Sequence, residues 1–207
     1  MKKARFLGND WETIKLDTVI KEPIMENVEM LSNHFNRYGK AIHYLDITDN
    51  DVVADASCGE GYGSFILSLK AGQVIGLDVN KEYIKTAEKY FGSEKIYFYG
   101  YGEFNTLVDK IVCIETFEHV PRRCEMAKFI TKLLTILKIG GSMFMTVPLG
   151  NNKPSSYNKF HLNEPSITVL HAIFDGFFKK KDYIIDKYTD SEGYEVEYCM
   201  LVLKERL

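Results

Sequence analysis

Hydrophobic and polar residues follow two different periods along the chain. Short apolar runs predict strands, whereas longer segments whose apolar residues recur every three to four positions predict amphipathic helices. The predicted strands cover 51–56, 73–79, 95–100, 109–115, 142–148, 182–188 and 195–204. The predicted helices cover 63–71, 81–91, 124–138 and 167–177. Strands that alternate with helices in this way predict an α/β fold with a mostly parallel sheet and helices on both of its faces.

Local signals refine this pattern at three places. Phe65, Ile66 and Leu69 have helical spacing and are expected to form the apolar face of helix 63–71. Gly140 and Gly141 are expected to end helix 124–138, because glycine is a common C-terminal stop. The last two predicted strands lie close together in the sequence, so we expect them to form a hairpin in which one strand runs antiparallel to the others.

The first 45 residues precede the alternating pattern. Their second half, at 22–45, predicts one or two helices that would form an N-terminal helical cap over the edge or mouth of the sheet. The chain has no internal repeat and no low-complexity linker, and 207 residues suit a single hydrophobic core. The sequence therefore predicts one domain that spans 1–207, with residues 1–45 as its cap.

Composition and charge argue against several classes of protein. The formal net charge is −3, so no basic excess attracts nucleic acid. The N-terminus lacks the apolar stretch of a secretory signal, and no segment approaches the length of a membrane span. The four cysteines have no C-x-x-C spacing and are expected to be reduced and mostly buried: Cys58, Cys113, Cys124 and Cys199. We therefore expect a cytoplasmic protein with neither a nucleic-acid nor a membrane partner.

The stretch DASCGEGYGS at 55–64 follows the first predicted strand. Gly59, Gly61 and Gly63 would let the backbone approach a ligand closely, because glycine has no side chain to obstruct it. The start of the following helix would direct N–H groups at an anionic part of that ligand. A tight strand-to-helix turn that binds no ligand is the alternative interpretation.

Asp78 ends the second predicted strand. A carboxylate at this place can accept hydrogen bonds from ribose hydroxyls, and it can also cap the helix that begins near Lys81. A glycine loop combined with a ribose-binding acid suits either a nicotinamide dinucleotide or S-adenosylmethionine. The loop lacks the G-x-G-x-x-G spacing of dinucleotide-binding folds, which favours S-adenosylmethionine.

The loop resembles the first motif of class I S-adenosylmethionine-dependent methyltransferases, acid-x-G-C-G-x-G. The match lies in Asp55, Cys58, Gly59 and Gly61, whereas Ser57 stands where many members have glycine. Four further segments follow in the order of a type-11-like branch of that family, at 37–45, 117–120, 133–148 and 160–177. The resemblance implies a Rossmann-like seven-stranded sheet of order 3-2-1-4-5-7-6, in which strand 7 is antiparallel.

The resemblance also implies that the cofactor is S-adenosylmethionine. The residues that it assigns to the cofactor are Asp55, Ser57, Cys58, Gly59, Gly61, Asp78, Val79 and Glu115. If the N-terminal cap covers the site, Arg37 would pair with the cofactor carboxylate. The alternative for Arg37 is a salt bridge at the surface.

The run Glu115-Thr-Phe-Glu118-His119 lies at the end of the fourth predicted strand. It resembles an E-x-x-E-H run of ubiquinone-biosynthesis O-methyltransferases and small-RNA 3′-end 2′-O-methyltransferases, which implies a metal that binds the acceptor hydroxyls. His161 corresponds to a later histidine of those families, so the implied ligands are Glu115, Glu118, His119 and His161, with Mg, Mn or Zn as the cation. The alternative is a site without metal, in which His119 acts as a base or is a structural group with its hydrogen bonds satisfied.

The predicted function is methyl transfer from S-adenosylmethionine to a hydroxyl of a small molecule or glycan, with His119 and Glu118 as catalytic residues. Two alternatives are open. The first is an RNA 2′-O-methyltransferase, which the E-x-x-E-H run favours and the acidic balance opposes. The second is a catalytically silent partner subunit that only binds the cofactor. The sequence leaves the acceptor and the oligomeric state open.

Overall fold

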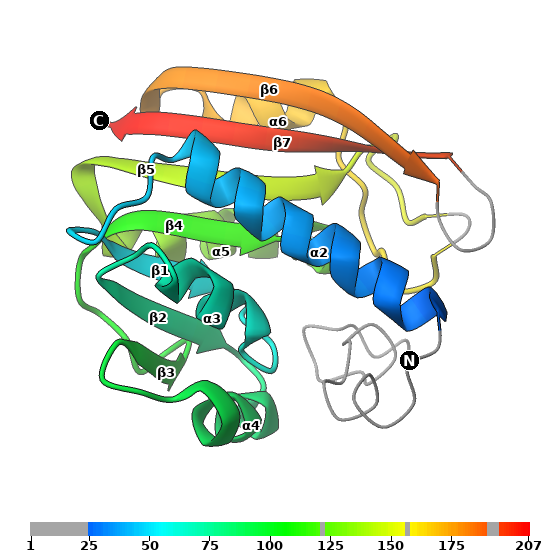
Figure 1. The fold of residues 1–207 in the computed structure, drawn as a ribbon. Helices are drawn as coiled ribbons and strands as arrows, with labels where there is room; N and C mark the ends of the chain where they lie inside the picture. Colours follow the sequence, from blue (N-terminus) through cyan, green and yellow to red (C-terminus); the bar gives the residue numbers. More distant parts are fainter. Residues whose placement is uncertain (1–24, 121–122, 156–157, 190–194) are drawn as a thin grey trace.

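A single seven-stranded sheet forms the centre of the molecule (Figure 1). The computed structural model describes residues 25–120, 123–155, 158–189 and 195–207. The strands lie in the order β3-β2-β1-β4-β5-β7-β6, and β7 runs antiparallel to both of its neighbours. Their bounds are β1 Val52–Ala56, β2 Gln73–Asp78, β3 Ile96–Gly100, β4 Val108–Ile114, β5 Leu137–Pro148, β6 Phe178–Thr189 and β7 Glu195–Arg206. This topology confirms the predicted sheet order and the antiparallel hairpin.

Helices cover both faces of the sheet, as predicted. On one face, α2 (Met25–Tyr44), α3 (Tyr62–Ser68) and α4 (Lys81–Phe91) enclose a core that includes Tyr38, Leu67 and Ala87. On the other face, α5 (Arg123–Ile136) and α6 (Ile167–Phe174) enclose a second core around Leu133 and Phe174. A short 3-10 helix, η2 (Phe117–His119), follows β4. The carboxyl ends of β1, β2, β4 and β5 therefore meet at one edge of the molecule (Figure 1).

The predicted C-terminal end of helix 124–138, which corresponds to α5, was wrong. Helix α5 ends at Ile136 and β5 begins at the next residue, so Gly140 and Gly141 lie inside the strand. The pairing of β4 with β5 shifts register there, because Val108 lies opposite Leu137 and Lys110 lies opposite Ser142. Gly140 has φ of 78°, a conformation that glycine adopts without strain. The glycine pair therefore accommodates a bulge in the strand.

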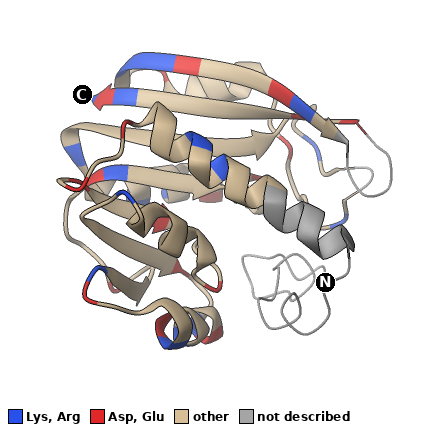
Figure 2. Ribbon diagram, in the orientation of Figure 1, with Lys and Arg blue, Asp and Glu red and all other residues tan. Residues whose placement is uncertain are grey.

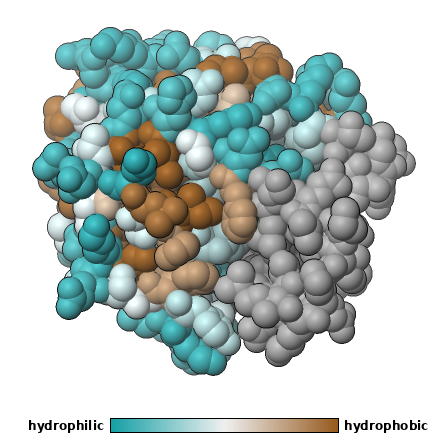
Figure 3. Space-filling model, in the orientation of Figure 1, coloured by the Kyte–Doolittle hydropathy of each residue, from teal (hydrophilic) through white to brown (hydrophobic). Residues whose placement is uncertain are grey.

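The predicted apolar face of α3 was also wrong in part. Phe65 and Leu69 are 46% and 65% exposed, whereas Ser64 and Leu67 are fully buried against the sheet. Helix α3 is only seven residues long, and it contacts α2 as well as β1, β2 and β3. Apolar side chains gather over α2 and α3 in the surface view (Figure 3).

Other sequence expectations concern segments and single residues. Helix α2 packs along the face of the sheet over β4 and β5, while residues 1–24 of the predicted cap lie outside the described residues. Cys58, Cys113 and Cys199 are free and buried, as predicted, and the side chain of Cys124 is outside the described part. Basic and acidic residues intermingle over the described elements in Figure 2. Among the described helices, none is both long enough and apolar enough to cross a bilayer.

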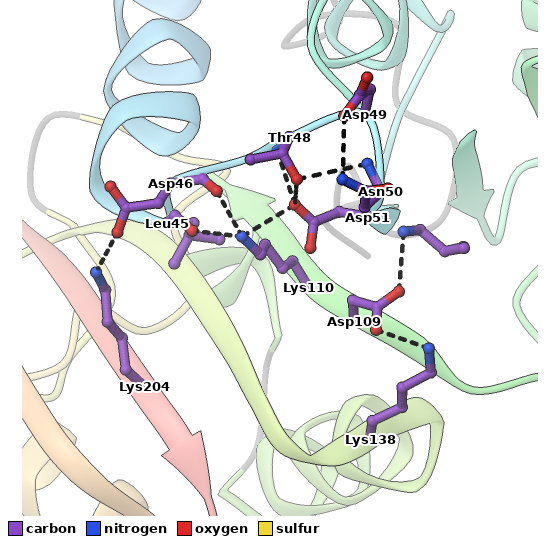
Figure 4. Close-up of polar contacts among 11 residues, drawn as sticks. Leu45, Asp46, Thr48, Asp49, Asn50, Asp51, Asp109, Lys110, Lys138 and Lys204 are labelled. Carbon is purple, nitrogen blue, oxygen red and sulfur yellow. Dashed lines mark hydrogen bonds and ion pairs between the residues drawn. The ribbon is translucent and has the colours of Figure 1, made fainter. Parts of the chain in front are cut away.

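Lys110 of β4 holds the turn between α2 and β1 (Figure 4). Its ammonium group donates to the carbonyl oxygens of Leu45 and Asp46 at 2.6 and 2.7 Å, and it lies 3.1 Å from a carboxylate oxygen of Asp51. That carboxylate also accepts from the backbone N–H and the hydroxyl of Thr48. One lysine thus satisfies carbonyl groups beyond the C-terminal end of α2 that would otherwise lack donors.

Candidate functional site

The glycine loop connects β1 to α3 in a strained but well-anchored path. The backbone N–H groups of Ser57 and Cys58 both donate to the carbonyl of Leu77, at 2.7 and 3.0 Å, which ties the loop to β2. Ser57, Gly59 and Gly61 have φ of 67°, 55° and 93°. Ser57 therefore adopts a backbone conformation that favours glycine, which explains in physical terms why a glycine would suit this position.

Asp55 is fully buried beneath this loop and joins three elements. Its carboxylate accepts from the hydroxyls of Tyr38 in α2 and Ser64 in α3, at 3.1 and 2.7 Å. Burial raises the pKa of Asp55 to about 7, while the two hydroxyl donors lower it and the charge of Asp78 raises it further. A Cβ atom at Gly63 would come within 2.0 Å of the Tyr38 ring, so glycine at this position lets Tyr38 reach Asp55.

Asp78 closes the loop from the end of β2. One carboxylate oxygen accepts from the N–H of Gly59 at 3.0 Å, and the other accepts from the N–H of Asn80 at 2.8 Å. The cap of α4 is Asn80, whose side chain accepts from the N–H of Glu82, so the alternative role of Asp78 as the cap of this helix does not hold. The neighbouring Val79 is 40% exposed. The carboxylate of Asp78 therefore belongs to the glycine loop.

Glu115 directly follows β4 and has φ of 45°, an uncommon conformation for a residue with a side chain. Its carboxylate accepts from the hydroxyl of Thr146 at 2.8 Å and lies 3.9 Å from the guanidinium of Arg37. Arg37 is buried, and its guanidinium lies 5.2 and 4.9 Å from the ring centroids of Tyr188 and Tyr198, two rings that also contact each other at a centroid distance of 5.8 Å. The Arg37–Glu115 pair is therefore an internal contact and not the surface salt bridge that the sequence left as an alternative.

The charge of Arg37 is stabilised by its surroundings. Burial lowers its pKa, but Glu115 and the two tyrosines outweigh that effect and raise the pKa above its ordinary value. Burial raises the pKa of the Tyr188 hydroxyl to about 12, with a further contribution from Glu115. Arg37 is therefore a permanent cation and Tyr188 a neutral hydroxyl at this edge of the sheet.

The side chains of Glu118 and His119, both in η2, converge with the side chain of His161. One ligand atom from each of these three buried residues lies within 4.8 Å of the others. Nε2 of His119 is 3.4 Å from Oε1 of Glu118, and the two imidazole rings meet edge to face with centroids 5.3 Å apart. The carbonyl of Glu118 accepts from Leu162 and Asn163, which fixes the loop that carries His161.

The structure thus divides the predicted residues into two groups. The first group belongs to the glycine loop or contacts it, and Val79 follows Asp78: Asp55, Ser57, Cys58, Gly59, Gly61 and Asp78. The second group is a separate cluster of Glu118, His119 and His161. Glu115 is directed to Thr146 and Arg37 and is not part of that cluster.

Sequence reasoning did not identify three residues of this region: Thr146, Glu164 and Tyr188. Glu164 accepts from Nδ1 of His161 at 2.7 Å. Its spacing of three residues after His161 was the available signal, because a histidine ligand commonly has a carboxylate partner. Thr146 and Tyr188 carry no such local signal, since they reach the site from distant strands.

Comparison with known proteins identifies relatives of this chain. A sequence model of the family described as mycolic acid cyclopropane synthetase matches residues 26–200. A probable S-adenosylmethionine-dependent methyltransferase of Mycolicibacterium smegmatis is 26% identical over 130 residues, which cover 59% of this chain and 49% of that protein. The chain thus spans about half the length of that curated relative.

Solved structures share the fold at low sequence identity. The cyclopropane synthase MmaA2 from Mycobacterium tuberculosis superimposes with a TM-score of 0.63 at 16% identity, covering 82% of this chain and 83% of that one. The N-methyltransferase NodS from Bradyrhizobium japonicum, in complex with S-adenosyl-L-homocysteine, superimposes with a TM-score of 0.62 at 12% identity, covering 81% of this chain and 86% of that one.

Proposed function

This chain belongs to the mycolic acid cyclopropane synthetase family and is a class I S-adenosylmethionine-dependent methyltransferase, and we propose that its acceptor is a hydroxyl group of a small molecule or glycan. The acceptor atom is the open part of this assignment, because the structural neighbours include both a cyclopropane synthase and an N-methyltransferase. The observation that carries the proposal is the cluster of Glu118, His119 and His161 at the carboxyl ends of the strands.

The glycine loop fits S-adenosylmethionine. A Cβ atom at Gly59 would meet no described atom within 4 Å, so this side of the loop has room for a ligand. We propose that Asp78 accepts hydrogen bonds from the ribose hydroxyls, since each carboxylate oxygen can accept more than one bond. Ser57, Cys58, Gly61 and Val79 would complete the loop side of this pocket, and Asp55 would hold the loop in shape from below.

Arg37 is proposed to face the carboxylate of the cofactor. Its distance of 3.9 Å from Glu115 is longer than a hydrogen bond, so the buried guanidinium has donors that suit a second anion. Glu115 would then balance the charge of Arg37 near the amino group of the cofactor. The anionic part of the cofactor is thus placed at Arg37 and not at the N-terminus of α3, a helix of only seven residues.

The cluster of Glu118, His119 and His161 fits a divalent cation. Two imidazoles and one carboxylate are a donor set for Mn, Zn or other first-row metals more than for Mg, and their ligand atoms lie close enough to share one ion. When bound, such a cation would polarise the acceptor hydroxyl and lower its pKa. We propose that Glu118 would offset the positive charge of the cation and that His119 and His161 would complete its ligand set. Glu115 is not among the proposed ligands.

The two alternatives to this function are less well supported. An RNA acceptor would need a basic surface, whereas the net charge is −3 and charges of both signs intermingle (Figure 2). A silent partner subunit would have no use for a buried carboxylate and two buried histidines brought together after β4.

The test separates the cofactor from the cation. Titration calorimetry with S-adenosyl-L-homocysteine should give a 1:1 isotherm in the wild type and after treatment with a chelator. Methyl transfer to a panel of phenols, diols and sugars should be lost after chelation and restored by Mn or Zn. Full activity after thorough chelation would refute the metal and leave His119 as a base, and transfer only to amines would refute the hydroxyl acceptor.

A further inference from the structure

Both histidines of the cluster are held at Nδ1 by a neighbouring acceptor. Nδ1 of His119 lies 3.1 Å from the carbonyl oxygen of Phe160, and Nδ1 of His161 lies 2.7 Å from Oε1 of Glu164. A carbonyl oxygen and a carboxylate can only accept, so Nδ1 must carry the proton in both rings. A neutral imidazole that is protonated at Nδ1 has its lone pair on Nε2. The two acceptors therefore select the same tautomer in both rings.

In His119 this tautomer directs the lone pair of Nε2 toward Glu118, and in His161 it leaves Nε2 as the nitrogen with a lone pair. Nε2 of His119 is 3.4 Å from Glu118, and the ligand atoms of all three residues lie within 4.8 Å. His161 and Glu164 are 8% and 6% exposed, so little water competes for their hydrogen bond. The geometry thus contains a carboxylate–histidine pair of the kind that orients metal ligands in proteins.

We propose that Glu164 is a positioning residue that fixes His161 in the Nδ1–H tautomer and thereby prepares its Nε2 to bind a divalent cation. This inference rests on the metal site of the proposed function. Glu164 acts through His161 and has no direct contact with the reacting atoms. The corresponding acceptor of His119 is a backbone carbonyl, so Glu164 is the one of the two acceptors that substitution can remove.

The backbone of Glu164 is held independently of its side chain. Its N–H donates to the carbonyl of Lys153 at 2.9 Å, and its carbonyl accepts from Asn152 at 2.8 Å. The adjacent Leu162 and Asn163 are bound to the carbonyl of Glu118. A change of the Glu164 side chain therefore leaves the backbone bonds of the loop in place, and its effect can be assigned to the lost contact with His161.

The first test reads the tautomer without any metal. Long-range nitrogen-15 NMR of the full chain, recorded in chelator well above the reference histidine pKa of about 6.5, should show His161 protonated at Nδ1 and not at Nε2. A His161→Gln variant identifies the signals. Glu164→Gln should keep this tautomer because its amide oxygen still accepts, whereas Glu164→Leu should lose it. An Nε2–H tautomer of His161 in the wild type would overturn the proposal, even if Glu164→Leu does not fold.

The second test uses Co(II) chloride as the metal probe, with binding followed by its visible absorption and by calorimetry. Glu164→Leu should weaken Co(II) binding about 10–100-fold, and Glu164→Gln should remain within about threefold of the wild type. Glu103→Leu is the matched control, because Glu103 accepts a local backbone bond from Gly100 on the β3 side of the sheet. It should bind Co(II) as the wild type does.

The outcomes separate this inference from the proposed function. If the wild type binds Co(II) and Glu164→Leu binds it equally well with the same spectrum, the role of Glu164 is refuted and the metal site stands. If the wild type does not bind Co(II), the metal site is refuted and the role of Glu164 toward it falls as well. A loss in Glu164→Leu that Glu164→Gln restores supports the proposal, since a purely structural role would not depend on the hydrogen-bond acceptor.

Discussion

Gly61 and Gly59 lie two residues apart in the same loop, yet alanine should have very different effects at the two positions. At Gly61, φ is 93°, and a Cβ atom would lie 2.8 Å from Cβ of Ala87 and 2.9 Å from the ring of Phe98. At Gly59, φ is 55° and a Cβ atom would meet nothing within 4 Å. Comparing alanine at the two positions therefore separates the effect of backbone strain alone from the effect of strain combined with steric crowding.

The expected magnitudes follow from these two terms. A left-handed conformation costs an alanine about 1–2 kcal/mol, and forcing a methyl group into a packed core costs about 1–3 kcal/mol more. Ala87 and Phe98 are buried in α4 and β3, so neither can move aside easily. Gly61→Ala should lower the free energy of unfolding by roughly 2–5 kcal/mol, and Gly59→Ala by only about 1–2 kcal/mol.

Urea unfolding followed by far-UV circular dichroism measures both values. Gly59→Ala has a second use, because its methyl group would enter the space proposed for the cofactor. It should weaken binding of S-adenosyl-L-homocysteine in calorimetry although the protein remains folded. Equal losses of stability in the two variants would refute the reasoning from crowding, and a larger loss in Gly59→Ala would refute the described path of the loop.

Three other substitutions, one of them paired with a control variant, test the remaining contacts. Since the pKa of Asp55 is about 7 in the folded chain and 3.8 in the free residue, its contribution to stability is complete below pH 4 and is lost as the pH rises to 7, by on the order of 4 kcal/mol. Asp55→Asn should remove this part of the pH dependence in urea unfolding between pH 5 and 8, and an unchanged slope would contradict it. Lys110→Met should lower the free energy of unfolding by about 1–3 kcal/mol, whereas Lys204→Met, which removes an exposed pair with Asp46, should cost less than about 1 kcal/mol; similar losses would count against the turn anchor. Arg37→Gln should weaken S-adenosyl-L-homocysteine binding about 10–100-fold in calorimetry, the loss expected for a charge-assisted hydrogen bond, and unchanged affinity would exclude Arg37 from the cofactor site.

The periodic parts of the fold were predictable because each strand and helix carries its own pattern. The strand order followed from the family resemblance, and the structure confirms it. The boundary between α5 and β5 was not predictable, because a pair such as Gly140 and Gly141 can either end a helix or form a bulge in a strand. The sequence indicates glycine there but not which use the chain makes of it.

Contacts between distant segments were the other part of the structure that the sequence predicted poorly. The convergence of His161 with Glu118 was expected from the resemblance, and its ligand role remains a prediction. By contrast, the contact of Arg37 with the rings of Tyr188 and Tyr198 joins a helix before the sheet to its last hairpin. No periodicity or spacing links these residues, since the contact depends on how the completed sheet is covered.

The anchor at Lys110 has a consequence for the order of folding. Helix α2 is the first described element of the chain, yet the lysine that closes its C-terminal turn is 64 and 65 residues away from the carbonyl groups that it binds. Lys40 of the same helix bonds to Asp186 and Tyr198, which are 146 and 158 residues away. During synthesis from the N-terminus, α2 therefore emerges well before any of these partners. The turn after the helix can therefore bind Lys110 once β4 has been made, whereas the contact of Lys40 with Tyr198 forms only after the last strand, and a chain truncated before β7 would lack it.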